Sequence, residues 1–221
     1  MPFVARVPRT IPFHVAVALL FATSGVMWGV WIARIPGVAG NLALDRAELG
    51  LVLPAFSIGA LIAFPVSAAI SSRYGSRVAI RIFGVLRGLL FPLLALAPNG
   101  LALAIALGLG GFAHGALDVA LNAQGVEIER RTTGSILSRA HGSFSLGALV
   151  GSLSVGFAAT AGLDLALQFA LPGLLAVAIF ATLTSQLLDD ETTPSGLQRS
   201  AAGGACACRH GRCGRSARSR W

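Results

Sequence analysis

Three polar side chains share one apolar stretch of the sequence, residues 100–126. His114, Asp118 and Asn122 follow one another at intervals of four residues, so on a helix they form a single polar stripe. A carboxylate within an apolar helix is costly, and such a group usually faces the interior of a helix bundle or a water-filled cavity. We therefore expect Asp118 to respond to a proton or a solute, with Asn122 and His114 lining the same cavity. The alternative is a structural bond between helices, and Asn122 could equally bond a neighbouring backbone group.

Arg87 is an ionisable residue inside another apolar stretch, residues 78–97. At the helical rise it lies about 13 Å from the end of its helix, and Asp118 lies about 12 Å from the same side. The tight Pro-Asn-Gly turn between the two stretches makes them antiparallel neighbours. We therefore predict an Arg87–Asp118 pair, which lowers the cost of burying each charge. Trp28, in the first apolar stretch, is expected to line the same cavity, with lipid contact as the alternative.

The composition is that of a membrane protein. Hydrophobic residues make up 55% of the 221 residues and charged residues only 12%, whereas a soluble domain needs roughly 25% charge to cover its surface. The net charge of +8 does not indicate nucleic-acid binding, because six of the 17 basic residues lie in the acid-free segment 196–221. The motifs of metalloproteases, serine hydrolases and P-loop enzymes do not occur. We expect neither an enzyme nor a nucleic-acid binder, and no cofactor.

The three cysteines, Cys206, Cys208 and Cys213, all lie near the end of the chain. With His210 they could offer soft metal ligands, but their spacing matches no standard zinc site, so no metal site is expected. The segment that contains them, residues 189–221, is rich in glycine and arginine. Polar sequence of this kind cannot bury a core, so the segment is predicted to be a disordered, basic cytoplasmic tail.

Six apolar stretches are long enough to cross the hydrocarbon core, which takes about 20 residues of helix. Lipid offers no water to the backbone, so each stretch is predicted to be a transmembrane helix. The first is too long for a cleaved signal peptide, and no small-residue cleavage site follows it. The predicted spans, within a transmembrane domain of residues 11–188, are 11–32, 49–70, 78–97, 100–126, 142–163 and 165–188.

Arginine residues in the short loops predict the orientation of the chain. Seven lie on the side of the N-terminus and two on the opposite side. Residues 1–10 and the tail are therefore both expected in the cytoplasm. Short turns make spans three and four, and spans five and six, antiparallel neighbours. The loop lengths together predict an all-α membrane protein of two three-helix units around a central cavity, in contact with the lipid bilayer.

The loop after the second span resembles a known signature. Residues 68–77 are similar to the sequence Gly-x-Leu-Ala-Asp-Arg-x-Gly-Arg-Arg/Lys of the major facilitator superfamily, with Arg73, Gly75 and Arg77 at matching positions. Ser72 stands where that family has aspartate. Over most of its length the chain thus resembles the N-terminal half of a major facilitator superfamily transporter. The resemblance implies half of a twelve-helix fold, in which this loop takes part in conformational change.

A second motif indicates which branch of the superfamily the chain resembles. Asp118 followed by Asn122 resembles the fourth-span motif of fucose-permease-like sugar transporters, in which the acid is linked to proton coupling and sugar recognition. Span five has Ser152 after Gly151 where antiporters of the superfamily carry Gly-Pro, which favours a symporter or a uniporter. The resemblance implies alternating-access transport of a small, sugar-like solute, with protons as the candidate coupling ion, in a bacterial inner membrane.

Full-length members of this superfamily have about twelve spans in two parallel halves, whereas the apolar pattern of this chain contains six. We expect a truncated half-transporter that pairs with a second copy of itself or with a separate C-terminal half. The alternative class is a non-transporting membrane protein, either a remnant or an assembly or structural partner of another chain.

Overall fold

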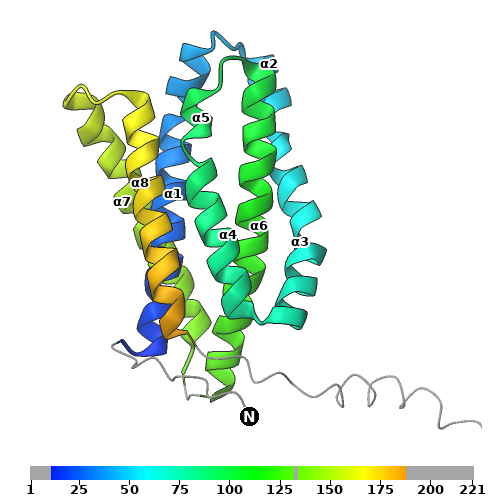
Figure 1. Ribbon diagram of the computed structural model, residues 1–221. Coiled ribbons are helices and arrows are strands. Elements are labelled where there is room, and N and C mark those ends of the chain that lie inside the picture. Colours follow the sequence, from blue (N-terminus) through cyan, green and yellow to red (C-terminus); the bar gives the residue numbers. More distant parts are fainter. Residues whose placement is uncertain (1–10, 132–133, 188–221) are drawn as a thin grey trace, which may run out of the picture. The chain divides into compact units, whose positions relative to one another are not determined.

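The computed structural model describes residues 11–131 and 134–187, and over these residues it is entirely helical (Figure 1). Six helices or helix pairs are long and apolar enough to cross a membrane. The predicted all-α class with six spans is therefore confirmed. The predicted cytoplasmic N-terminus, residues 1–10, and the predicted basic tail, residues 189–221, lie outside the described residues.

The helices follow one another with short connections. Two of the spans are broken, since α2 and α3 together form the second span and α4 and α5 the third. A short 3-10 turn at Thr184–Gln186 follows the last helix. The bounds are α1 Phe13–Asn41, α2 Arg46–Val52, α3 Pro54–Tyr74, α4 Ser76–Leu90, α5 Leu93–Leu96, α6 Gly100–Arg131, α7 Ile136–Thr160 and α8 Leu165–Leu183.

Prolines and caps explain the helix boundaries. Pro54 occupies the first turn of α3, where its missing N–H costs nothing. Pro92 separates α4 from α5, because proline cannot continue the backbone ladder of a helix. Asp45 caps α2 and forms a reciprocal capping box with Glu48. The helix α1 is longer than its predicted span, because it passes through Pro36 and buries one more turn against the bundle.

Each long helix packs mainly on a partner from the other half of the chain. The most extensive contacts join α1 with α7, α3 with α6, and α4 with both α6 and α8. Figure 1 shows α1, α7 and α8 on one side of the bundle, α3 and α6 on the other, and α4 between them. The predicted three-helix groups thus interleave and do not pack as separate bodies. The predicted contact of spans three and four is present, whereas α8 packs on α4 and α1 more than on its chain neighbour α7.

Glycines bring the backbones of these partner helices into direct contact. A methyl group added at Gly25 or Gly29 of α1 would lie 2.0 Å from a carbonyl oxygen of α7. A methyl group added at Gly111 of α6 would lie 2.0 Å from the Phe56 carbonyl oxygen of α3. Small residues at a four-residue interval are a common way for membrane helices to approach closely. Gly25 and Gly29 thus allow the backbones of α1 and α7 to come into contact.

The crossing of α1 with α7 is repeated by the crossing of α6 with α3. Gly25 of α1 faces the carbonyl oxygen of Phe144, just as Gly111 of α6 faces that of Phe56. The helices α1 and α6 therefore occupy equivalent places, as in the inverted repeats found within each half of major facilitator proteins. Trp28 and His114 each follow the matched glycine by three residues, so they too are equivalent.

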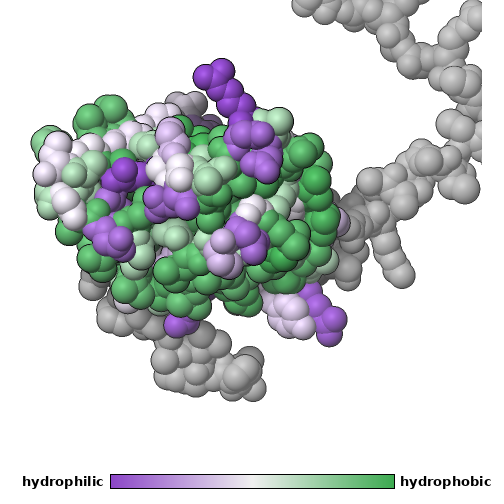
Figure 2. Space-filling view, turned by 90° about the horizontal axis from the view of Figure 1, so that it is seen from above, coloured by the Kyte–Doolittle hydropathy of each residue, from purple (hydrophilic) through white to green (hydrophobic). Residues whose placement is uncertain are grey.

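Charge is distributed along the bundle as a membrane requires. Figure 2 looks onto the end near α2 and α5, where hydrophilic residues gather and hydrophobic residues surround them. The exposed side chains on the flanks of the helices include many large apolar residues, among them Leu61, Leu149 and Leu174. Such flanks suit contact with lipid, and the hydrophilic end suits contact with water.

Candidate functional site

An aromatic group joins three helices at the crossing of the two repeats. The rings of Trp28 on α1 and His114 on α6 are stacked, with centroids 5.6 Å apart and planes 12° apart. Phe56 of α3 lies 5.2 Å from Trp28 and 5.5 Å from His114, measured between ring centroids. The Nδ1 atom of His114 is buried and has no hydrogen-bond partner among the described residues. The structure therefore brings together two predicted site residues, Trp28 and His114, and adds Phe56.

Arg87 lies nearby, and its partner differs from the predicted one. Its side chain is only 5% exposed. The guanidinium donates one hydrogen bond to the Ser24 hydroxyl and another, at 3.3 Å, to the Ser24 carbonyl oxygen. The predicted ion pair with Asp118 is not formed, since Arg87 reaches toward α1 while Asp118 is exposed on the surface of α6. The two charges still interact electrostatically at longer range.

Asp118 and Asn122 lie on one exposed face of α6. The Asn122 side-chain amide donates to the Asp118 carbonyl oxygen at 2.8 Å, which is the backbone bond foreseen as the alternative for Asn122. His141, at the start of α7, interacts electrostatically with Asp118. The His141 ring packs edge-on against Phe21 of α1 at 5.3 Å. The polar face thus includes a group from α7 as well as the predicted stripe of α6.

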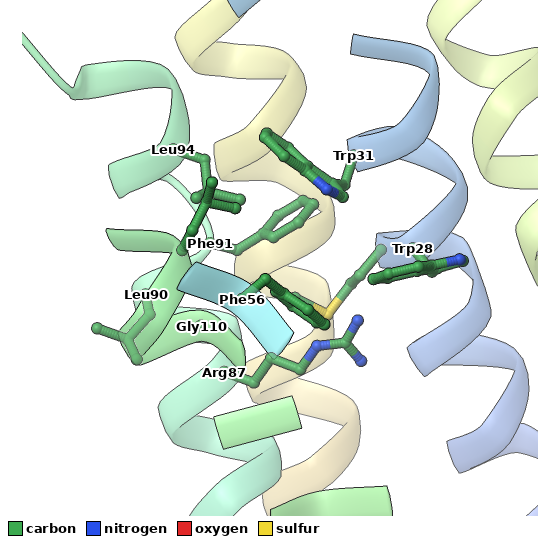
Figure 3. A pocket seen from close by; sticks show the side chains of 10 residues that line it. Trp28, Trp31, Phe56, Arg87, Leu90, Phe91, Leu94 and Gly110 are labelled. Atoms are coloured by element: carbon green, nitrogen blue, oxygen red, sulfur yellow. The ribbon is translucent and has the colours of Figure 1, made fainter. Parts of the chain in front are cut away.

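A small cavity lies between the aromatic group and the far end of α4. Its volume is about 20 Å³, which is room for about one water molecule. Figure 3 shows the Arg87 guanidinium beside the Trp28 indole at the edge of this space, with Phe56 and Phe91 in its wall. Apart from Arg87, the lining is apolar: Met27, Trp28, Trp31, Phe56, Leu90, Phe91, Leu94, Leu107 and Gly110.

The loop between the second and third spans is held by backbone geometry and by one arginine. Gly75 has a φ of 89°, a left-handed conformation that only glycine adopts at little cost. Arg77 donates at 2.9 Å to the Ser185 carbonyl oxygen at the end of the sixth span. The Arg73 guanidinium lies 5.3 Å from the centre of the Tyr74 ring. The signature loop is therefore tied to the sixth span through Arg77.

Sequence reasoning missed three residues of the site: Ser24, Phe56 and His141. Ser24 lies one turn before Trp28, and this spacing could have placed it on the same helix face. His141 could have been suspected as an ionisable residue at the start of an apolar span. Phe56 gave no signal, because an aromatic residue in an apolar helix is ordinary core or lipid-facing material.

Comparison with known proteins identifies the family. The family model of the Major Facilitator Superfamily matches residues 16–218. This chain belongs to the major facilitator superfamily. It is 35% identical over 144 residues to an uncharacterised transporter of Sinorhizobium fredii, a match that covers 65% of this chain and 38% of that protein. It is 34% identical over 139 residues to an uncharacterised MFS-type transporter of Yersinia pestis, covering 63% of this chain and 36% of that protein.

A third relative is the membrane protein MosC of Rhizobium meliloti, 32% identical over 145 residues. That match covers 64% of this chain and 35% of MosC. The matched part of this chain thus spans little more than a third of the length of each of these relatives. Family membership and the six apolar helices make the chain a multi-pass membrane protein of a transporter family, a family whose members are not enzymes.

Proposed function

We propose that this six-helix unit forms one wall of a solute pathway that works by alternating access. The observation that carries the proposal is the exposure of Asp118 on the surface of a membrane-spanning helix. A charge that faced lipid at this point would cost at least roughly 2.5–3.5 kcal/mol. An aqueous pathway along this face of α6 removes that cost and gives the carboxylate access to protons and solute.

The neighbouring groups support a polar solute. Substrate sites in such transporters lie near the middle of the membrane, at the interface between repeats. The stacking of Trp28 on His114 where α1 meets α6 supports such a site here. Asp118 and Asn122 supply hydrogen-bonding groups and Trp28 supplies an aromatic face. This combination supports the sugar-like solute and the proton coupling that the family resemblance implies.

A pathway of this kind needs a second wall. We propose that a second copy of the unit, or a separate C-terminal half, faces Asp118 across the pathway. We propose that the N-terminus and the signature loop face the cytoplasm of a bacterial inner membrane, an orientation that the distribution of arginines in the loops supports. Arg73, Gly75 and Arg77 then act at the cytoplasmic end, where the bond from Arg77 to the sixth span can change with the conformation.

The test is uptake into proteoliposomes that contain an active assembly. Radiolabelled monosaccharides and monocarboxylates are supplied together with an inward proton gradient. Asp118→Asn should abolish gradient-driven uptake and leave the folded yield unchanged. Asp164→Asn is the matched control, because Asp164 caps α8 through its side-chain oxygen and asparagine caps a helix equally well. Normal uptake by Asp118→Asn, or no uptake of any of these solutes by the wild type, would refute the proposal.

A further inference from the structure

Arg87 carries a buried charge that forms no ion pair with any carboxylate among the described residues. A guanidinium has five N–H donors, and a buried ion without a counter-charge costs several kcal/mol. Both acceptors of Arg87 belong to Ser24, and both are neutral oxygens. Among the described residues no carboxylate lies within ion-pair distance, and Asp118 acts only at longer range. The guanidinium is therefore poised to take an anion as a further partner.

The cavity next to Arg87 selects the kind of anion. It is about 20 Å³, so it admits a compact charged head and not a whole solute. The rest of its wall is apolar, with the rings of Trp28, Trp31 and Phe91 among the lining groups. Figure 3 shows the guanidinium next to the rings of Trp28 and Phe56, at the edge of the space that Trp31 and Phe91 also line. A planar carboxylate matches the fork of a guanidinium. Because the cavity admits only this head, the apolar body of the anion has to lie outside it, against the neighbouring rings of Trp28 and Phe56.

We propose that Arg87 binds the carboxylate of a small organic acid with an apolar body, so that the transported solute is an organic anion in place of the neutral sugar that the family resemblance implies. The inference rests on the proposed function, because it names the solute class for the same site. It assigns Arg87 to solute recognition and leaves Ser24 as the group that holds the guanidinium in place when no solute is bound. It also separates the roles of the two charges, with Arg87 on the solute and Asp118 on the proton.

Binding can be measured without transport, on the purified full-length chain in detergent. Benzoate is the probe, and benzamide is its neutral isostere. Trp28 and Trp31 line the cavity, so tryptophan fluorescence reports occupancy. We expect a saturable change with benzoate and none with benzamide at equal ionic strength, set with sodium chloride. The chloride also serves as a competitor, because displacement of benzoate by chloride alone would mean a site for any anion and would overturn the assignment to organic acids.

Two variants locate the site. Arg87→Gln should weaken benzoate binding at least about tenfold, since it removes a charge-assisted bond. Arg81→Gln is the matched control, because Arg81 is an exposed arginine on the same helix. If Arg87→Gln does not fold, Arg87→Lys keeps the charge without the fork and should weaken benzoate binding while keeping the preference over benzamide.

The inference is overturned if wild-type protein shows no saturable benzoate response, if benzamide binds equally well, or if the Arg87 variants bind benzoate like the wild type. These outcomes are independent of the uptake assay. Benzoate binding that depends on Arg87, together with failed uptake, would leave the anion site standing and refute only the transport function. Uptake of neutral sugars without benzoate binding would leave the transport function standing and refute only the anion site.

Discussion

At the scale of single residues, a buried polar contact joins α4 to α1. The Arg87 guanidinium donates to both the hydroxyl and the carbonyl oxygen of Ser24. Bonds from a charged donor contribute about 1.5–3 kcal/mol each, and a buried partner left without its bond costs a similar amount. The contact therefore fixes the direction of Arg87 next to the aromatic cavity, and Ser24 is as important for that geometry as the arginine itself.

Because Arg87 bonds to Ser24 and forms no ion pair with Asp118, substitutions of Arg87 and Ser24 should be energetically coupled. Thermal unfolding of Ser24→Ala, Arg87→Gln and the double variant should reveal a coupling free energy above about 1 kcal/mol, because the two side chains share one interaction. Asp118→Asn and Arg87→Gln should instead add within about 0.5 kcal/mol, because these residues form no ion pair. Strong coupling of Arg87 to Asp118, with none to Ser24, would show that the predicted ion pair forms in the membrane after all.

Sequence reasoning found the residues of the site more readily than their contacts. Intramembrane polar groups are few and costly, so His114, Asp118 and Arg87 stood out at once. Helical spacing correctly placed Asp118 and Asn122 on one face. The partner of Arg87 could not be predicted, because equal depth along two neighbouring helices does not say toward which third helix a long side chain points.

At the scale of elements, glycine contacts decide which helices are neighbours. On α7, Gly151 is packed against α1, and an added methyl group would lie 2.2 Å from the Val26 carbonyl oxygen. The helices α3 and α6 pack just as tightly at Gly59, where an added methyl group would lie 2.0 Å from the Gly108 carbonyl oxygen. Backbone atoms cannot move aside as a flexible side chain can, so these positions tolerate no larger residue.

Two glycines of α7, Gly151 in a tight contact and Gly156 in open space, offer a matched pair of substitutions. Gly151→Ala should destabilise the protein by about 1–3 kcal/mol, because it overpacks a backbone contact. Gly156→Ala should be neutral or slightly stabilising, because Gly156 has open space around it and alanine favours helix. Unfolding in mild detergent, followed by heat or by denaturant, measures both. Equal effects of the two substitutions would mean that the α1–α7 contact is looser than described.

The helices were more predictable than their arrangement. Hydropathy alone located all six spans, since a membrane demands about 20 apolar residues per crossing. The four-residue spacing of small residues, such as Gly25 and Gly29 on α1 and Gly147 and Gly151 on α7, is visible in the sequence and is typical of helix packing faces. It could not say that these two faces meet, because apolar helices carry little information about their partners. The interleaving of the two helix triplets, and the extension of α1 through Pro36, therefore emerged only from the structure.

At the scale of the whole molecule, the described helices combine a polar face on α6, at Asp118, with apolar faces on other helices. The matched region covers 38% or less of each relative, and in the proposed function the polar face of α6 borders a pathway that a second wall completes. Leu174 on α8 is typical of the apolar faces, with its side chain 61% exposed. The proposed function requires that water reaches Asp118 and that lipid covers Leu174.

Cysteine accessibility in native membranes distinguishes a water-exposed Asp118 from a lipid-covered one. In a background with the three native cysteines replaced by serine, single variants Asp118→Cys and Leu174→Cys are exposed to a charged thiol reagent. The reagent reacts with thiols in water and not with thiols in hydrocarbon. If an aqueous pathway follows α6, Asp118→Cys is modified several-fold faster than Leu174→Cys. An excess of the transported solute then slows this reaction. If Asp118→Cys is as unreactive as Leu174→Cys in the assembled protein, no aqueous pathway follows α6, and the proposed function is contradicted.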